Sequence, residues 1–466
     1  MRKMFALAAV YIAALNSTPL HAGNDVEQLR QQLQALKDEY QRRIEALEAG
    51  VRAAEEEARQ ARIEAEKVAS ATQSAAASQP TGSENSFNPA LSVILDGRYA
   101  AFDNDPSDYE LPGFPLGGEA GLGEEGIGLG HTELTASANV DDKFYGQMTV
   151  ALHEHEGATE VELEEAFIET LGLGGGLTLR AGRFFSAIGY VNEQHEHAWD
   201  FADAPLIYRG LFGNHLRDDG MRLSYVAPTD TYIQLGAEAL RGSRFPGGGE
   251  QDGIGLWTAF AHIGGDIDIE QSWQLGLSHW EADVDGRSTG GHGHSHDHGD
   301  EHDEAPIFTF SGDSTGNALD LVYKWAPKGN FTDRNLKLQF EYFDRQEEGS
   351  LSHVHDGDLH VAEFDGDQRG WYVQGIYQFQ PQWRTGLRYD RLDSDNRASN
   401  ETMLEHPGLD DEGHTPERYS AMLEWLPSEF SRVRLQYNRD KSYAERDDQF
   451  FLQYTHSLGS HGAHQY

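Results

Sequence analysis

Short segments in which apolar and polar residues alternate with a period of two fill the chain after Asn88, and this pattern limits the fold most strongly. In residues 335–343, NLKLQFEYF, leucine and aromatic side chains fall on one face, while Lys337, Gln339 and Glu341 fall on the other. Residues 371–380 and 432–440 repeat the pattern. Because successive side chains of a strand point to opposite faces, each segment predicts a β-strand with one apolar and one polar face.

Short and long connections alternate between these segments, and the long ones hold most of the histidines and many acidic residues. About 16 segments fit between Asn88 and Leu458, and tight turns at one end with long loops at the other are typical of outer-membrane barrels. We therefore predict an all-β transmembrane barrel of about 16 antiparallel strands over residues 88–466. The short connections are residues 140–143, 173–176, 228–230, 380–382 and 427–430.

The N-terminus has the features of a secretory signal peptide. Arg2 and Lys3 precede an apolar stretch, and Ala22 is a small residue suited to cleavage. No later stretch approaches the roughly 20 apolar residues that a membrane-spanning helix requires. We expect residues 1–22 to be removed on export and the mature chain to reach the outer membrane.

A heptad pattern precedes the predicted barrel. Residues 23–70 carry apolar positions spaced three and four apart, with one stutter at Leu36, Tyr40 and Ile44. The pattern predicts an α-helical coiled coil in the periplasm that pairs with copies of itself, and a single amphipathic helix is the alternative. Residues 71–87 are small and polar, so we expect a flexible linker there.

Charge and composition favour cations as partners. The formal charge is −42, from 78 acidic and 36 basic residues, which argues against a nucleic-acid partner. The chain has no cysteine, so a metal site must use His, Asp and Glu. Hydrophobic residues make up 38%, below the roughly 45–50% of average proteins, which fits a wet interior.

Several histidines gather in predicted external loops. Residues 290–306, GGHGHSHDHGDEHDEAP, mix imidazoles with carboxylates, which are ligands for Zn(II). A solvated loop is the alternative, because this composition cannot build a packed core. Since histidines recur in several loops at one rim, we predict that these loops capture a divalent metal. The proposed ligands are His292, His294, His296, His298 and His302 in the fifth loop, and His153, His155, His353, His355 and His360 in other loops.

The third predicted loop, residues 192–216, combines aromatic and aliphatic residues with polar ones. In general porins the third loop folds into the lumen, so we expect this loop to form the constriction and to set its selectivity. The alternative is that Trp199, Phe201 and Leu206 only attach the loop to the wall. The residues proposed to line the constriction are His195, Glu196, His197, Asp200 and Asp203. Of these, His195, His197, Asp200 and Asp203 are proposed to bind metal.

A basic stripe falls on positions that the alternation directs into the lumen, namely Arg384, Arg388, Arg432 and Arg434. These arginines either form an anion path or pair with acids across the pore. The candidate acids are Asp390, Asp440, Glu424 and the carboxylates of the third loop. The sequence pattern leaves both interpretations open.

Catalysis is not expected from this sequence. We find no nucleophile with an oriented base, and the HxH pairs lack the helical spacing of a hydrolytic zinc site. We therefore expect no enzymatic activity and no obligatory cofactor, with Zn(II) either transported or bound by the loops.

Three stretches resemble a known family: residues 88–100, 180–206 and 449–466. They are similar to the zinc-regulated outer-membrane proteins of Gram-negative bacteria, which themselves resemble phosphate-selective porins. The resemblance covers most of residues 88–466. It implies zinc-limited expression and zinc entry and, through kinship with trimeric porins, a homotrimer. Members are often labelled TonB-dependent receptors, but those have roughly 22 strands and a plugged lumen. Because residues 23–87 offer no plug domain, we expect no TonB partner.

Together these features predict an outer-membrane porin for divalent metal, most of all Zn(II), that contacts membrane lipid. We expect it to assemble as a homotrimer through the coiled coil and the barrel wall. One alternative is an anion-selective, phosphate-like porin that uses the arginine stripe. Another is a surface metal-binding protein that transports nothing.

Overall fold

A computed structural model describes residues 89–117, 120–155, 158–249, 251–289, 308–355, 358–405, 407–443 and 445–459, together with Gln34. Apart from Gln34, the predicted signal peptide (1–22), coiled coil (23–70), linker (71–87) and histidine-rich loop (290–306) lie outside the described residues. The side chains of His155 and His355 also lie outside them.

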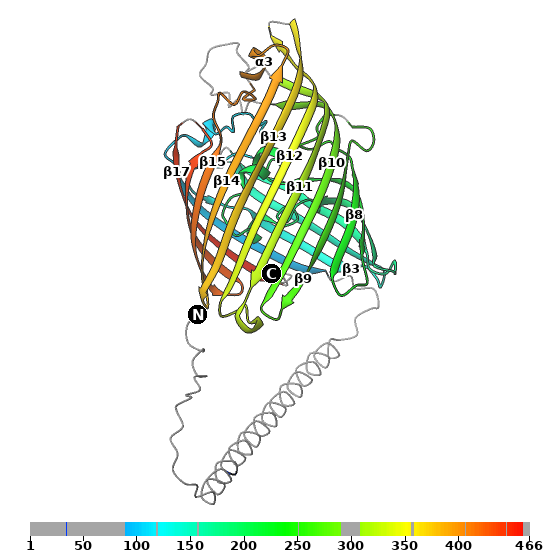
Figure 1. The fold of residues 1–466 in the computed structure, drawn as a ribbon, viewed down its shortest axis with the longest axis vertical. Coiled ribbons are helices and arrows are strands. Elements are labelled where there is room, and N and C mark those ends of the chain that lie inside the picture. Colours follow the sequence, from blue (N-terminus) through cyan, green and yellow to red (C-terminus); the bar gives the residue numbers. More distant parts are fainter. Residues whose placement is uncertain are drawn as a thin grey trace, which may run out of the picture. The chain divides into compact units, whose positions relative to one another are not determined.

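The described chain forms one antiparallel sheet that closes on itself (Figure 1). Its strands are β1 (Ala90–Ala101), β2 (Gly126–Leu129), β3 (Thr132–Asn139), β4 (Phe144–His155), β5 (Ala158–Thr170), β6 (Leu177–Phe185), β7 (Arg217–Val226), β8 (Tyr232–Leu240), β9 (Leu256–Asp268), β10 (Gln271–Thr289), β11 (Phe308–Trp325), β12 (Asn335–His355), β13 (Asp358–Gln380), β14 (Trp383–Ala398), β15 (Glu417–Ser428), β16 (Ser431–Lys441) and β17 (Asp447–Gly459).

Two of the 17 described strands share one place in the ring. β2 pairs with residues 97–100 of β1 and β3 pairs with residues 90–94 of the same strand, so they are two parts of one barrel strand interrupted at Gly130 and His131. β1 closes the ring by pairing with β17 on its other side. The described barrel therefore has 16 positions, which confirms the predicted architecture.

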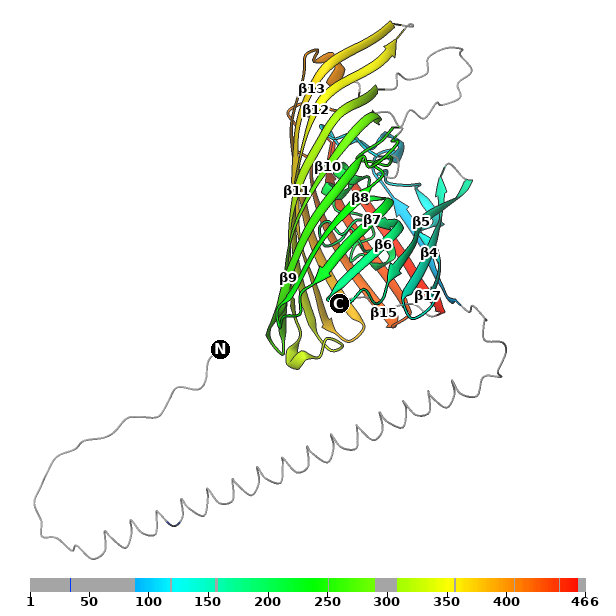
Figure 2. The ribbon, with the colours of Figure 1, turned by 90° about the vertical axis from the view of Figure 1, so that its right-hand side faces the viewer.

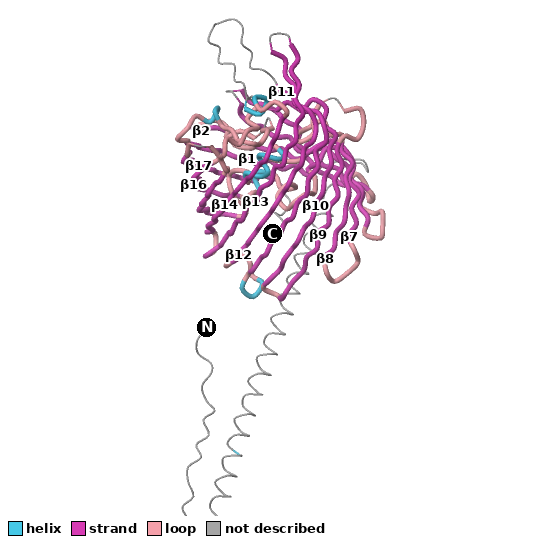
Figure 3. The backbone as a smooth tube through the Cα atoms, turned by 45° about the horizontal axis from the view of Figure 1, so that its top comes forward, coloured by secondary structure: helices cyan, strands magenta, loops and turns pink. Residues whose placement is uncertain are grey.

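Helices are few and short among the described residues, and they lie inside the ring of strands or at its ends (Figure 3). No helix in this part of the chain is long and apolar enough to cross a membrane. The helical elements are η1 (Pro106–Asp108), η2 (Glu196–Ala198), α2 (Leu206–Phe212), η3 (Pro327–Gly329) and α3 (Thr402–Glu405).

The walls of the barrel differ in height (Figure 2). β12 and β13 have 21 and 23 residues, whereas β3 and β6 have 8 and 9. This height corrects one prediction: His153, His155, His353, His355 and His360 lie on strands and not in loops. Alternation alone did not reveal where these strands end, because their polar outer halves resemble loop sequence.

The two faces of the strands have the predicted character. On β12 the side chains of Gln339 and Glu341 are buried toward the lumen, while Leu338 points outward and is 44% exposed. On β14, Arg388 points inward, whereas Leu387 points outward and is 68% exposed. The exterior thus carries exposed apolar side chains along the strands.

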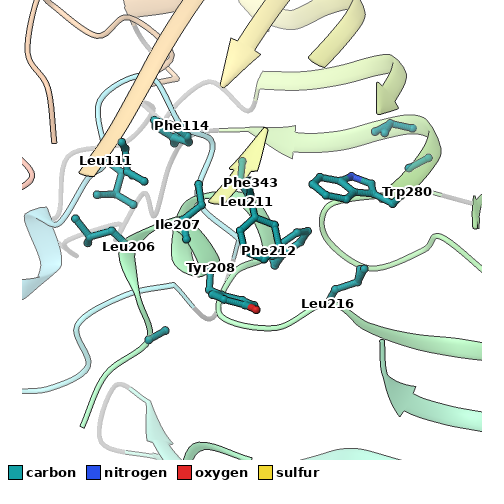
Figure 4. Packing of buried hydrophobic residues seen from close by; sticks show 14 of the residues in the cluster. Leu111, Phe114, Leu206, Ile207, Tyr208, Leu211, Phe212, Leu216, Trp280 and Phe343 are labelled. Carbon is teal, nitrogen blue, oxygen red and sulfur yellow. The ribbon is translucent and has the colours of Figure 1, made fainter. Parts of the chain in front are cut away.

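An apolar cluster fills part of the lumen (Figure 4). Its centre is α2, in which all seven residues are buried. Pro205 precedes the helix and Gly213 ends it with φ of 62°, a left-handed conformation that favours glycine. The helix packs against the loop between β1 and β2 and against β10 and β12. The residues of this contact are Leu111, Phe114, Ile207, Tyr208, Leu211, Phe212, Trp280 and Phe343.

Candidate metal centre

The third loop runs over residues 186–216 between β6 and β7, so it begins before residue 192, where the sequence pattern placed its start. A buried asparagine closes this loop on itself. Asn192 donates hydrogen bonds from Nδ2 to the carbonyl oxygens of Ser186 at 2.7 Å and Leu216 at 2.8 Å. Its Oδ1 accepts a hydrogen bond from the Leu216 amide at 2.7 Å. One side chain therefore joins the beginning and the end of the loop.

Contacts to β12 hold one side of this loop. The amide of Tyr190 and the hydroxyl of Tyr208 donate to Glu341 Oε2 at 2.9 and 2.7 Å. Gly189 has φ of 63°, and a Cβ there would lie 2.5 Å from the same carboxylate oxygen, so the chain needs glycine at this position.

Histidines of the loop meet β3 and β5, which lie on the opposite side of the ring from β12. His197 Nδ1 lies 2.6 Å from Glu133 Oε1. His195 Nδ1 lies 3.3 Å from Glu133 Oε2 and 3.2 Å from Glu164 Oε2. The third loop thus spans the lumen, and its two predicted histidines reach the far wall.

A third imidazole joins them from the break between β2 and β3. His131 Nε2 lies 2.8 Å from Glu164 Oε1 and 4.0 Å from Glu133 Oε1. Two groups of potential ligands result, in each of which the donor atoms lie within 4.8 Å of one another. The first is Glu133, His195 and His197, and the second is His131, Glu133 and Glu164.

A β-bulge in β5 supplies two of the carboxylates. The pairing register with β4 shifts between Thr149 and Val150, which pair with Glu165 and Leu163. Glu164 is thus the extra residue, and a bulge turns consecutive side chains toward one side of a sheet. Both Glu164 and Glu165 accordingly reach His195, through Oε2 atoms at 3.2 and 3.0 Å.

Two carboxylates lie behind the imidazoles rather than among the inner ligands. Glu165 Oε2 faces His195 Nε2 at 3.0 Å, and Glu196 Oε2 faces His131 Nδ1 at 3.5 Å. A carboxylate on the outer ring nitrogen fixes the orientation of a histidine and raises its basicity toward a metal. His131 and His195 therefore each have one carboxylate, that of Glu164, on the ring nitrogen that faces the centre. Each has a second carboxylate on its other ring nitrogen.

The electrostatics of the centre favour positive charge. Burial alone would lower the pKa of His195, but the carboxylates of Glu133, Glu164 and Glu165 outweigh burial and raise that pKa well above its usual value. The carboxylates of Glu164 and Glu196 also lie beside His131, at 2.8 and 3.5 Å from its two ring nitrogens. The same negative field that holds protons here attracts a metal cation, which competes with those protons.

His215, at the end of the loop, behaves in the opposite way. Its ring stacks on Trp199, with centroids 5.0 Å apart, and packs against Phe185. Its Nδ1 is 3.1 Å from the carbonyl oxygen of Asn192. Burial lowers the pKa of His215 to about 3, so this imidazole is neutral and structural.

Asp200 and Asp203, predicted as metal ligands, face basic side chains instead. Asp200 lies 2.5 Å from Lys337 Nζ and 3.5 Å from Arg384 Nη1. Asp203 lies 2.7 Å from Arg388 Nη2 and 2.9 Å from Arg418 Nη1. These cations outweigh burial and lower the pKa of both carboxyl groups. The structure therefore uses the two aspartates to attach the loop to β12, β14 and β15.

The predicted arginine stripe faces the lumen and is largely paired. Arg384 Nε and Arg434 Nη2 lie 2.5 and 2.9 Å from the two oxygens of Glu424. Arg432 donates to the carbonyl oxygens of His197 and Trp199. The stripe could form an anion path or pair with acids, and these contacts agree with the pairing. The apolar attachment of the loop is also present, since Trp199, Phe201 and Leu206 are buried.

Three further predicted histidines, His153, His353 and His360, have partners outside this centre. His153 on β4 pairs with Glu160 on β5 at 3.4 Å. His353 and His360 oppose each other across β12 and β13, and their rings stack at 5.0 Å. His353 also stacks on Phe308, at the start of β11. The role of these histidines in metal capture stays a prediction.

Sequence reasoning missed His131, Glu133, Glu164 and Glu165. One signal was present: the adjacent acids EE at 164–165 break the alternation inside a strand pattern, as a bulge does. Glu164 contacts His195, which lies 31 positions later in the chain, and Glu133 contacts His197, which lies 64 positions later. Local sequence patterns do not encode contacts over such separations.

Comparisons with known proteins show similarity but no family. No protein-family model matches the chain. An uncharacterized protein of Aquifex aeolicus (strain VF5) is 29% identical over 406 residues, covering 82% of this chain and 81% of that one.

Among solved structures, the trimer form of OmpT of Vibrio cholerae is 11% identical, with a TM-score of 0.47, over 80% of this chain and 99% of that one. An anion-selective porin from Comamonas acidovorans has the same identity, TM-score and coverage. OmpF of Salmonella typhi in complex with daunomycin is 12% identical, with a TM-score of 0.46, over 79% of this chain and 97% of that one.

Proposed function

We propose that this chain is an outer-membrane channel for a divalent metal ion, with Zn(II) as its substrate. The outward faces of the strands support the membrane location. Leu338, Leu387, Leu423 and Leu435 are all exposed on the exterior of the closed barrel. A band of exposed apolar side chains on a closed barrel is stable in hydrocarbon and unfavourable in water.

One observation carries the metal assignment: three imidazoles and two carboxylates converge on the lumenal wall under the third loop. Glu133 and Glu164 are 1% and 2% exposed, and an ionised carboxylate that is buried needs a cation or strong hydrogen-bond donors. Nitrogen from histidine and oxygen from glutamate are ligands that Zn(II) prefers when cysteine is absent.

The centre also remains open to the lumen. His131 and His195 are 16% and 18% exposed. Conduction requires a site that draws an ion in and still releases it. A partly open set of imidazoles and carboxylates meets this requirement better than a closed cage does.

Planar-bilayer recording of the full chain tests this function. Micromolar zinc should produce brief, voltage-dependent blocks of the open channel. The double variant His195→Ala, His197→Ala should shorten or abolish these blocks. His262→Ala, which removes a lumenal histidine of β9 outside the centre, is the matched control and should retain them. Blocks of unchanged duration in the double variant would rule out the centre as the zinc site.

Anion conduction is the second candidate, and the lumenal arginines of β14 and β16 favour it. Arg384 is 22% exposed and Arg432 is 11% exposed, so both reach the lumen despite their acidic partners. The reversal potential in a salt gradient separates the two candidates, because its sign reports whether cations or anions carry the current. A protein that binds zinc without any conductance would instead be a surface metal-binding protein.

A further inference from the structure

The centre holds more donors than one ion needs. Zn(II) in proteins usually takes four ligands. Here three imidazole nitrogens and the four oxygens of Glu133 and Glu164 face one another, with Glu165 and Glu196 behind them. The two groups of ligands share Glu133 but draw on different histidines.

Glu164 has the geometry of a bridging carboxylate. Its Oε1 faces His131 Nε2 at 2.8 Å, and its Oε2 faces His195 Nδ1 at 3.2 Å. An ion bound by His131 therefore lies on one side of this carboxylate, and an ion bound by His195 lies on the other. Glu133 belongs to both groups as well. Its Oε1 lies 2.6 Å from His197 Nδ1 and 4.0 Å from His131 Nε2, so this one oxygen lies between the two sets of histidines.

We infer that the centre binds two divalent ions at once, bridged by Glu133 and Glu164. The inner ion takes His195, His197 and one oxygen from each bridging glutamate, which completes four ligands. The outer ion takes His131 and one oxygen from each bridging glutamate, which leaves a position for water. This inference rests on the proposed metal site and adds a second ion to it.

Charge supports two ions rather than one. Glu133, Glu164, Glu165 and Glu196 place four carboxylates around the centre, and two divalent cations carry a matching charge. Arg217 approaches Glu164 only to 3.9 Å, and its closer partner is Glu162. The competing explanation is that protonated imidazoles neutralise the carboxylates without any metal.

Two neighbouring ions give the site a route to release. Carboxylate-bridged metal ions lie roughly 3.5–4 Å apart. At this separation each ion weakens the binding of the other, so that arrival of a second ion promotes departure of the first. The three-ligand outer position, beside the partly exposed His131, is where ions exchange with the lumen.

The inference is tested by comparing the number of zinc ions bound per folded chain between the wild type and its variants. The full-length protein and its variants are dialysed against buffered free zinc, and bound metal is measured by mass spectrometry. Histidines elsewhere contribute an equal background to every sample. His131→Ala should lose one ion, the pair His195→Ala and His197→Ala should lose one, and the triple variant should lose two. His262→Ala should lose none. A variant that fails the heat-modifiability test of folding is replaced by its glutamine counterpart.

The outcomes separate the two proposals. If the triple variant loses only one ion, the centre is mononuclear: the two-ion inference is wrong and the proposed function stands. If no variant loses any ion, protonated histidines occupy the cluster and both proposals fall.

Discussion

Glu164 and Glu165 are consecutive residues of one strand, yet both carboxylates contact His195, one at Nδ1 and the other at Nε2. A regular strand would direct one of them out of the barrel. The β-bulge therefore places an inner ligand and its outer support on the two nitrogens of a single imidazole.

The outer carboxylate should tune zinc affinity. Because such support is worth roughly 10- to 100-fold in metal affinity, Glu165→Gln should weaken zinc binding at the centre by about that factor. Zinc blocks in bilayer recordings should shorten in proportion, with single-channel conductance little changed. Glu160→Gln, on the same strand but outside the centre, is the control. Equal block durations in wild type and Glu165→Gln would contradict the supporting role.

Two lumenal arginines of β14, Arg384 and Arg388, should separate selectivity from stability. Arg384 is partly exposed to the lumen. If Arg384 is removed, its partner Asp200 still pairs with Lys337, and its partner Glu424 still pairs with Arg434. Arg384→Gln should therefore shift the cation-to-anion permeability ratio toward cations with little loss of stability. Arg388 is buried against Asp203, so Arg388→Gln should cost about 3 kcal/mol, at the low end for a broken buried pair, because Arg418 remains. Reversal potentials and urea unfolding measure the two effects. The same effect from both variants would contradict this division.

Alternation predicted the barrel because the period of two is fixed by strand geometry. The faces of residues 335–343 follow from that period, and so do the lumenal positions of Arg388 and Arg434. The third loop was predicted to enter the lumen by analogy with general porins. Its apolar residues Trp199 and Leu206 are buried in the structure.

The metal centre was predictable only in part. His195 and His197 stand out as an HxH pair, but their partners lie on strands that the sequence separates widely. Asp200 and Asp203 have the side chains of metal ligands, but they pair with lysine and arginine side chains of β12, β14 and β15. Which acid meets a metal and which meets an arginine is decided by tertiary packing.

The neutral imidazole of His215 should make the barrel sensitive to acid. Its pKa of about 3 in the folded chain lies below the roughly 6.5 of an unfolded histidine, so the unfolded state binds more protons between these values. Stability should therefore fall as pH drops below about 6.5, by up to about 1.4 kcal/mol per pH unit from this residue. His215→Phe keeps the ring packing and should unfold in urea with a flatter pH dependence. His279→Phe, on β10, should follow wild type. Parallel curves for wild type and His215→Phe would exclude this origin.

The heptad pattern of residues 23–70 should govern assembly. An apolar seam of this kind buries itself against copies of the chain, so deleting residues 24–80 should weaken the oligomer. The deletion ends before β1 begins at Ala90, and the barrel should still insert. Sedimentation in detergent measures the oligomer, and heat modifiability reports the folded barrel. A monomeric intact protein would contradict the predicted trimer.

The histidine-rich segment should serve capture and not conduction. Thr289 and Phe308 pair directly across β10 and β11, so deleting residues 291–303 leaves residues 290 and 304–307 to close the hairpin. Clustered imidazoles without cysteine favour several weak, exchangeable zinc sites that are lost below about pH 6 as the imidazoles protonate. The deletion should therefore lower zinc uptake when the metal is scarce, whereas conductance and the duration of zinc blocks should persist because His195 and His197 remain. A Gly/Ser segment of equal length in place of residues 291–303 controls for loop length and should behave like the deletion. Calorimetry that finds equal zinc binding before and after the deletion would exclude capture by this segment and leave the lumenal centre as the site where the channel meets its metal.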